Sequence, residues 1–280
     1  MVIQITMLKN EVHLLEELFP QWQKYADGFV FLDDGSNDGS YEFLQKNKEK
    51  YNIREIIRLD RDPSKLVIES EVRQMLYDAA LKYSNKIICL DADEYLDGEL
   101  TKEQLENILD ANQDTLFVLP WVQYVSKTSI RVDGPWNSNF KDRVACYQKR
   151  EVFRPIHMHS EHLPRPGRVQ MLGFPTLFIA HLQWLDKKAV AVKQYFWKVT
   201  DYVNHHVHGA NVISPTEYDA SINNFQWEIV ELPEELCLKV NPDLYSKYPI
   251  ENNYKFKFIK ENIKKYNIPN LNDWGMNIHG

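Results

Sequence analysis

Cysteine is scarce in this 280-residue sequence, which contains only Cys89, Cys146 and Cys237, all far apart. The absence of any Cys-x-x-Cys pair argues against a zinc site made of cysteines. An odd and scattered set predicts free thiols, which are typical of a reducing compartment. The first residues, MVIQITMLKNE, lack the basic start and the apolar stretch of a secretory signal peptide. We therefore expect a cytoplasmic protein.

Long apolar runs and a basic excess are lacking as well. No run of about 18 apolar residues occurs, so the sequence predicts no transmembrane segment. Acidic residues outnumber basic ones by 40 to 33, and the formal net charge is −7. Nucleic-acid-binding domains usually carry a basic excess, so we do not expect a nucleic-acid partner. The composition is otherwise that of an ordinary soluble globular protein.

Short apolar runs alternate with amphipathic segments through the first hundred residues. We expect strands at 2–8, 28–32, 55–59 and 86–90. Helices are expected from Glu11 to about Pro20, after residue 40 with Asp38 or Ser40 as its cap, and over 68–83. The strands begin at intervals of roughly 26 to 31 residues, which is typical of βαβ units and a parallel sheet.

The second half is less regular. It predicts helices at 101–109, 186–206 and 255–266, strands at 115–125 and 143–148, and a structured loop region at 151–180. The fold class is therefore α/β, with a mostly parallel central sheet flanked by helices on both faces. We expect one body over residues 1–210 and a helical C-terminal extension over residues 211–280.

Two acidic motifs follow apolar strands of this predicted sheet. Asp33-Asp34-Gly35-Ser36 follows FVFL, and Asp91-Ala92-Asp93 follows KIICL. Ligands of such sheets bind beyond the carboxyl ends of the strands, so both motifs are expected at one ligand-binding rim. In an extended chain Asp91 and Asp93 would face one ligand, about 7 Å apart at the backbone.

Paired carboxylates of this kind suit Mg²⁺ or Mn²⁺, which also coordinates the phosphates of a substrate. A plainer interpretation exists for each motif. The first would then be an ordinary turn with a helix cap, and the second a solvated strand end.

The order of these motifs resembles that of the family 2 glycosyltransferases of GT-A fold. The resemblance rests on Lys-Asn-Glu after the first strand, LDDGSNDGS, an arginine-bearing helix and ICLDADEYL. It covers residues 3–97 well and weakens toward residue 200. It implies transfer of a sugar from a nucleoside diphosphate sugar, with UDP-sugar favoured, to a glycan or another hydroxyl acceptor. Arg73 stands in Val-Arg-Gln where the family has Ala-Arg-Asn, so only the arginine carries over.

The resemblance also implies roles for particular residues. Asp33 or Asp34 would bind the uracil or ribose, and Asp93, helped by Asp91, would bind the metal ion. The nucleotide-sugar site as a whole would comprise Thr6, Lys9, Asn10, Glu11, Asp33, Asp34, Ser36, Arg73 and Asp91.

His181 ends the apolar, strand-like run LFIAH. By the same resemblance it would complete the metal site or touch the diphosphate, and imidazole suits Mn²⁺ better than Mg²⁺. It could equally be a structural histidine. Three lysines that follow could reach a diphosphate, although lysines on helices usually face water: Lys187, Lys188 and Lys193.

An inverting transfer needs a general base that takes the proton of the acceptor hydroxyl. Titratable groups are concentrated in HMHSEHLPR at 157–165, which could also be a plain surface loop. We predict Glu161 as the base, Asp142 as the second candidate and Asp133 as the third. Four aromatic residues could stack on an acceptor sugar or simply form core: Trp121, Tyr124, Trp136 and Phe140.

Three other functions are compatible with an acidic α/β rim. A nucleotidyltransferase would need a glycine-rich loop after the first strand, and MLKNEVH offers none. A metal-dependent hydrolase could use the same acids without affinity for a nucleotide. A binding module would retain nucleotide affinity but would catalyse no transfer.

Overall fold

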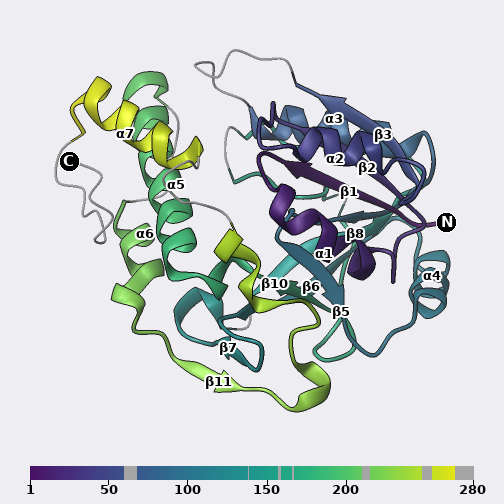
Figure 1. The fold of residues 1–280 in the computed structure, drawn as a ribbon. Helices are drawn as coiled ribbons and strands as arrows, with labels where there is room; N and C mark the ends of the chain where they lie inside the picture. The colour runs from purple at the N-terminus through teal and green to yellow at the C-terminus, as the bar shows by residue number, and fades with distance from the viewer. Residues whose placement is uncertain are drawn as a thin grey trace.

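The computed structural model describes residues 1–59, 68–137, 139–156, 159–165, 167–209, 215–247 and 254–268. Within these ranges it contains an 11-stranded sheet whose main path is β11-β7-β6-β8-β4-β1-β2-β3 (Figure 1). At its centre, β1 (Ile3–Leu8) pairs in parallel with β2 (Gly28–Asp33) on one side and β4 (Lys86–Cys89) on the other. Beyond β2, β3 (Ile53–Arg58) continues the parallel arrangement.

The other half of the sheet mixes strand directions. β8 (Phe140–Cys146) runs antiparallel between β4 and β6 (Thr115–Tyr124). The remaining strands are β5 (Glu94–Asp97), β7 (Ser129–Arg131), β9 (Val169–Met171), β10 (Phe178–His181) and β11 (Ile229–Glu231). In the part of the chain that is described, only β5, β7 and β8 oppose the common direction. The predicted mostly parallel sheet is confirmed.

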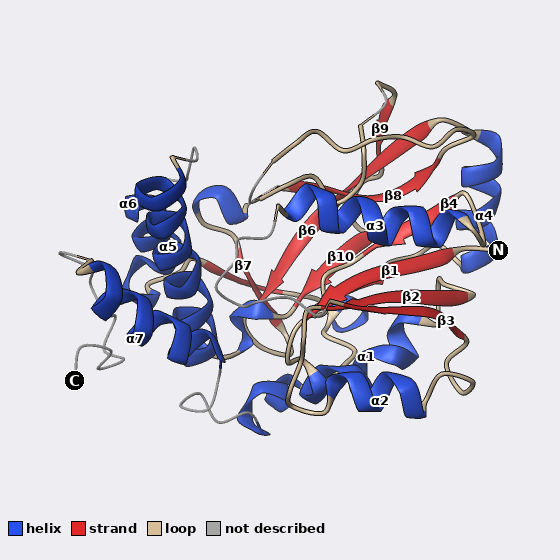
Figure 2. Ribbon diagram, turned by 90° about the horizontal axis from the view of Figure 1, so that it is seen from above, coloured by secondary structure: helices blue, strands red, loops and turns tan. Residues whose placement is uncertain are grey.

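Helices cover both faces of the sheet, because alternate strand residues point to opposite sides (Figure 2). Phe29 and Phe31 of β2 pack against Phe19 of α1 (Val12–Trp22), with ring centroids 5.4 and 5.7 Å from it. Val30 and Leu32, the intervening residues, belong to the cluster under α3 (Glu69–Leu81). The α1 face also holds α2 (Ser40–Lys46), while α4 (Lys102–Ala111) covers the sheet near β8. This is the layered α/β fold that the strand pattern predicts.

Two local predictions are wrong. Neither Asp38 nor Ser40 occupies the N-cap position of α2, which is Gly39, in the left-handed conformation at φ 99°. Asp38 Oδ1 nevertheless accepts the backbone N–H of Ser40, the first residue of α2, at 2.9 Å, and its Oδ2 accepts the backbone N–H of Val12, where α1 begins, at 3.1 Å. The region 151–180, predicted as a structured loop, also contributes β9 to the sheet, whereas β10 matches the strand-like run LFIAH.

A second group of helices lies beside the sheet (Figure 1). It consists of α5 (Lys187–His208), α6 (Pro215–Ile222) and α7 (Tyr254–Tyr266). Tyr195 and Val199 of α5 pack against Ile259 of α7. Short 3-10 helices join the elements: Gly134–Trp136, Gln183–Leu185, Asn223–Phe225, Glu234–Leu236 and Pro242–Lys247. The predicted boundary between a body at residues 1–210 and an extension at residues 211–280 stays a prediction. Among the described residues, no helix is both long enough and apolar enough to cross a membrane.

Candidate functional site

The two acidic motifs lie at the same rim of the sheet. Asp33 is the last residue of β2, and Asp91 follows the end of β4 at Cys89. Both strands pair in parallel with β1, one on each side of it. The motifs therefore flank the carboxyl end of β1, which is where open parallel sheets bind their ligands.

Asp33 is fully buried, and its two carboxylate oxygens differ. Oδ1 accepts a hydrogen bond from the backbone N–H of Ser36 at 3.0 Å and lies 3.8 Å from Arg58 Nε. Oδ2 has no hydrogen-bond partner among the described residues. A buried acceptor without a donor is costly, so a donor brought by a ligand would be strongly favoured at this oxygen.

The turn that follows Asp33 holds the segment after β1 in place. Ser36 Oγ and Ser40 Oγ accept hydrogen bonds from the backbone N–H groups of Asn10 and Glu11, each at 2.9 Å. Asn10 has a left-handed backbone at φ 56°. Its side-chain amide donates to Asn37 Oδ1 at 2.9 Å and accepts the backbone N–H of Asn37 at 2.8 Å. These serines and asparagines have a structural role whatever else they bind. Thr6, also predicted for the pocket, is buried in β1.

The C-terminal helix reaches this first motif. Lys255 Nζ of α7 lies 3.3 Å from Glu11 Oε1, and the Tyr254 ring lies 5.2 Å from Lys9 Nζ. Lys9 in turn forms an ion pair with Asp34 at 3.3 Å. Burial lowers the pKa of Lys255, but the nearby acidic groups outweigh it and leave that pKa above its usual value. The wall of the predicted nucleotide pocket is therefore built from both ends of the described chain.

The segment Asp91-Ala92-Asp93 is a turn and not an extended strand. β4 ends at Cys89 and β5 begins at Glu94, whose side chain accepts the backbone N–H of Asp91 at 3.0 Å. The extended geometry predicted for this motif is therefore wrong. Asp91 and Asp93 consequently have different partners.

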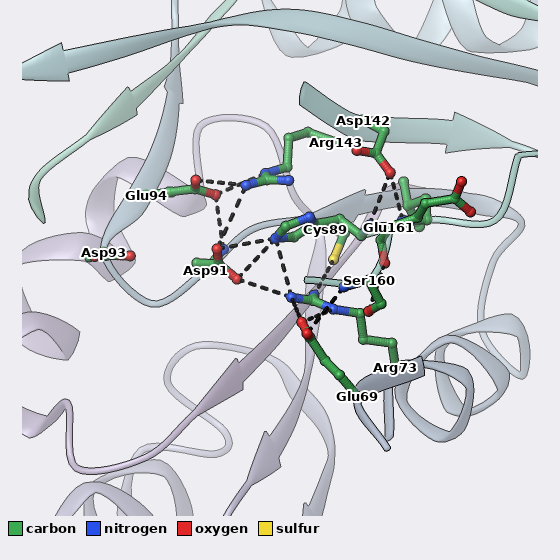
Figure 3. A network of polar contacts seen from close by, with 12 residues as sticks. Glu69, Arg73, Cys89, Asp91, Asp93, Glu94, Asp142, Arg143, Ser160 and Glu161 are labelled. Carbon is green, nitrogen blue, oxygen red and sulfur yellow. Dashed lines mark hydrogen bonds and ion pairs between the residues drawn. The ribbon is translucent and has the colours of Figure 1, made fainter. Parts of the chain in front are cut away.

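Asp91 lies in a network of buried charges (Figure 3). Its carboxylate is 3.1 Å from His162 Nε2, 3.6 Å from Arg143 and 3.7 Å from Arg73. Desolvation raises the pKa of Asp91, but these three groups together hold it well below its usual range. The structure thus places Arg73, which the sequence predicts for the donor site, beside Asp91.

Two further acids complete this network. Arg143 makes a bidentate contact with buried Glu94, at 2.7 and 2.9 Å. Arg73 pairs with Glu69 at 2.7 Å, and Glu69 also accepts the backbone N–H of Ser160 at 3.2 Å. Sequence reasoning missed Arg143 and Glu69 as members of the site. Nothing in the local pattern around either residue marks it, because their partners are remote along the chain.

Asp93 faces the helical region instead. Its Oδ2 lies 2.7 Å from Lys193 Nζ and 3.5 Å from His181 Nε2. Burial raises the pKa of Asp93, but the charge of Lys193 beside it outweighs burial and leaves the pKa far below its usual value. Lys193 thus reaches the site, whereas Lys187 and Lys188 are exposed.

Asp93 and His181 fit a divalent cation. A carboxylate oxygen and an imidazole nitrogen that face each other at 3.5 Å can bind one ion with little movement. No group of three or more His, Cys, Asp or Glu side chains suited to a metal occurs in the described ranges. The protein would thus supply few ligands, as is usual for ions that keep waters and bind substrate phosphates.

The candidate bases differ in their surroundings. Asp142 is buried, and its Oδ2 accepts the backbone N–H groups of His162 and Leu163 at 2.9 and 3.3 Å. Burial raises the pKa of Asp142, while His162, Arg143 and the backbone donors bring it below its usual value. Asp142 therefore holds the segment that carries His162.

Glu161 is half-buried, 3.5 Å from Arg165 and 3.8 Å from Arg154. Figure 3 shows it on the opposite side of the Asp91 network from Asp93. Asp133 accepts two hydrogen bonds from one edge of the Arg131 guanidinium group, from Nε at 2.7 Å and from Nη2 at 2.6 Å. His157, in the same predicted cluster, lies outside the described residues. The assignment of the base stays a prediction.

Among the aromatic residues, Trp121 borders the site. Its ring stacks on His181 with centroids 4.5 Å apart, and its indole N–H donates to Glu94 at 2.8 Å. Trp136 lies 5.4 Å from Trp121, and both line a surface pocket with Phe174. Tyr124 is fully buried and belongs to the core, and Phe140 lies in β8.

No protein-family model and no curated protein matches the chain. Among solved structures it is similar to S. aureus TarS, with 13% identity, a TM-score of 0.44 and coverage of 94% of this chain and 49% of that chain. It is also similar to S. aureus TarS 1-349 in complex with UDP, with 15% identity, a TM-score of 0.42 and coverage of 98% of this chain and 79% of that chain. The chain spans about half the length of the first of these structures. Scores this low establish neither a family nor a function.

Proposed function

We propose that the chain is a metal-dependent glycosyltransferase that moves a sugar from a nucleoside diphosphate sugar to a hydroxyl acceptor, with inversion. One observation carries this proposal. Two acidic motifs flank the end of β1, and one offers an unpartnered buried acceptor while the other is surrounded by cationic side chains. A nucleoside diphosphate sugar has matching parts, namely a base and ribose with hydrogen-bond donors and an anionic diphosphate.

In this proposal Asp33 is the nucleoside end of the site. Its Oδ2 would accept a hydrogen bond from a base N–H or a ribose hydroxyl. A UDP-sugar is the favoured donor because of the resemblance to the family 2 glycosyltransferases, and GDP- and dTDP-sugars are the alternatives. Asn10 and Ser36 would keep the wall of the pocket rigid through the hydrogen bond that joins them at 2.9 Å. Such preorganisation lowers the entropy that is lost when the donor is positioned.

Asp93 and His181 form the diphosphate end, with Asp91 nearby. A divalent cation held there, with Mn²⁺ favoured over Mg²⁺ by the imidazole, would neutralise charge on the leaving diphosphate. Lys193 Nζ holds the same Asp93 oxygen at 2.7 Å, and its side chain is 25% exposed. It is therefore free to turn from Asp93 toward a phosphate oxygen when the donor is bound.

The acceptor would lie on the side of Trp121 and Trp136. The Trp121 ring covers His181, and the indole N–H of Trp136 is buried without a hydrogen-bond partner among the described residues. A sugar ring offers both an apolar face for stacking and hydroxyl oxygens for that N–H. Glu161 stays the predicted base, but it lies across the Asp91 network from Asp93, so its role is tested separately from this acceptor position. Glu161→Gln should lower kcat by about 10²-fold or more while the Kd for UDP is unchanged, and an unchanged kcat would exclude Glu161 as the base.

A thermal-shift panel of UDP, GDP, dTDP and their sugars, each with and without Mn²⁺, tests the proposal. A ligand at 100 times its Kd stabilises the folded state by about 2.7 kcal/mol, so binding would be visible. We expect the largest shift with a UDP-sugar and Mn²⁺, followed by sugar transfer in a radiolabel assay. No shift with any nucleotide would overturn the proposal and leave a metal-dependent hydrolase. A shift without transfer to any acceptor would indicate a binding module.

A further inference from the structure

A series of buried hydrogen bonds ends at the Nδ1 atom of His181. The Oε1 atom of Gln123 lies 2.7 Å from the indole Nε1 of Trp184 and 2.5 Å from His181 Nδ1. The Nε2 atom of the same amide lies 3.0 Å from the carbonyl oxygen of Trp121. Gln123, His181 and Trp184 are each at most 2% exposed, so water does not compete for these groups.

The chemistry of the partners fixes the direction of every bond in this series. An indole N–H can only donate, so the amide atom that faces Trp184 must be the oxygen. The other amide atom faces a carbonyl oxygen and must be the NH₂ group. Because Gln123 Oε1 can only accept, His181 Nδ1 must carry a proton and donate it. In a neutral imidazole the lone pair is then on Nε2.

His181 Nε2 faces Asp93 Oδ2 at 3.5 Å. Two acceptors that face each other inside a protein are unfavourable unless a positive group lies between them or beside them. Lys193 Nζ, 2.7 Å from the same Asp93 oxygen, is the positive group beside them, whereas a cation between them would also engage the Nε2 lone pair. A purely structural histidine would be expected to have both ring nitrogens satisfied by donors and acceptors of the protein. The stacked ring of Trp121, 4.5 Å away, leaves His181 little freedom to turn from this position.

We propose that Gln123 is a positioning residue that fixes His181 in its Nδ1–H tautomer and so presents the Nε2 lone pair, together with Asp93, to a divalent cation. The role toward the cation rests on the proposed function, whereas the tautomer is a property of the metal-free protein. Trp184 sets the orientation of the Gln123 amide, because its indole N–H donates the first hydrogen bond of this series. Neither Gln123 nor Trp184 would touch the donor.

The tautomer can be measured without any metal. In protein labelled with ¹⁵N-histidine, two-bond ¹⁵N–¹H correlations at mildly alkaline pH distinguish the Nδ1–H form, the Nε2–H form and the imidazolium. The His181 signals are assigned by their loss in His181→Gln. We expect the Nδ1–H form in the wild type and in Gln123→Glu, whose carboxylate still accepts from both neighbours. Gln123→Leu should give a mixture of tautomers. An Nε2–H form or an imidazolium in the wild type would overturn the proposal.

Mn²⁺ affinity, measured by the free-ion EPR signal, tests the consequence. Loss of a residue that orients a ligand typically weakens metal binding by about 10- to 100-fold, which we expect for Gln123→Leu and not for Gln123→Glu. Gln4→Leu, the same change at another buried glutamine, is the matched control. Equal affinity in the wild type and a folded Gln123→Leu would overturn the role of Gln123 and leave the cation site intact. Absence of Mn²⁺ binding in the wild type would instead overturn the cation site and, with it, the role given to Gln123.

Discussion

The two ends of the rim hold their carboxylates in opposite ways. Around Asp33 the contacts are mostly backbone N–H groups and hydroxyls, and one buried oxygen has no described donor. Around Asp91 and Asp93 each carboxylate meets at least one cationic side chain. The surroundings of Asp33 suit a neutral ligand group that donates hydrogen bonds. The surroundings of Asp91 and Asp93 suit a charged ligand group, such as a diphosphate with a divalent cation. In the proposed function, this difference matches separate parts of one donor to separate ends of the rim.

The strongest way to break this division is to remove Asp93. Asp93→Asn should lower sugar transfer by about 10³-fold, because loss of charge stabilisation worth several kcal/mol corresponds to that factor. The Mn²⁺-dependent part of the thermal shift with UDP should vanish as well. Asp110→Asn, on the remote α4 helix, is the control. Transfer within tenfold of the wild type would show that the charged end does not hold the cation through Asp93.

The buried pair at the charged end can be broken from its basic side. Arg143→Met leaves Glu94 buried and unpaired, which should cost about 3–5 kcal/mol of the free energy of unfolding. The double variant Arg143→Met, Glu94→Gln should recover much of this loss, as urea unfolding curves would show. Arg150→Met removes an exposed pair with Asp78 and should change stability little. A small change in the free energy of unfolding for Arg143→Met would mean that Glu94 does not depend on Arg143 for its charge compensation.

The nucleoside end predicts a smaller and more selective effect. Asp33→Asn should weaken UDP binding by about 10- to 100-fold, since hydrogen bonds to charged groups contribute about 1.5–3 kcal/mol. Mn²⁺ affinity without nucleotide should be unchanged, because Asp33 lies at the other end of the rim. Calorimetric titration measures both quantities. A larger loss for Asp34→Asn than for Asp33→Asn would reverse the assignment of the two acids.

The smallest effect concerns pH. Burial raises the pKa of Glu69, but Arg73 and His162 outweigh it and depress the pKa in the folded state. The stability that Glu69 contributes is therefore fully present above its unfolded pKa of about 4.3 and is lost as the pH falls through the lower folded value. The difference in unfolding free energy between the wild type and Glu69→Gln should be largest near neutral pH and shrink in acid. A difference that stays constant in acid would contradict this, and Glu55→Gln serves as the control.

The architecture could be predicted because its signals are local. Apolar runs predicted at 28–32 and 86–90 became β2 and β4, and the helix expected over 68–83 became α3. Each boundary lies within two residues of the expected one, since alternation and helical periodicity depend on near neighbours. The carboxyl-end placement of both acidic motifs followed from the same regularity.

The charged network could not be predicted, because its contacts are long-range. His162 reaches Asp91 across 71 positions, and Arg143 reaches Glu94 across 49. The period of two assumed for Asp91 and Asp93 failed for a different reason, because the contact that breaks it is local. The Glu94 side chain folds back onto the backbone of Asp91 and closes a turn, which a strand pattern does not encode.

The contact between Lys255 and Glu11 has a consequence for how the protein is made. These two residues are 244 positions apart. Glu11 lies just after the first strand, and Lys255 lies in the first turn of α7, the last described helix. During translation the strands β1 to β4 and both acidic motifs are synthesised long before Lys255. A nascent chain at that stage has the rim but not its final wall, so the pocket is completed only after Lys255 has been synthesised.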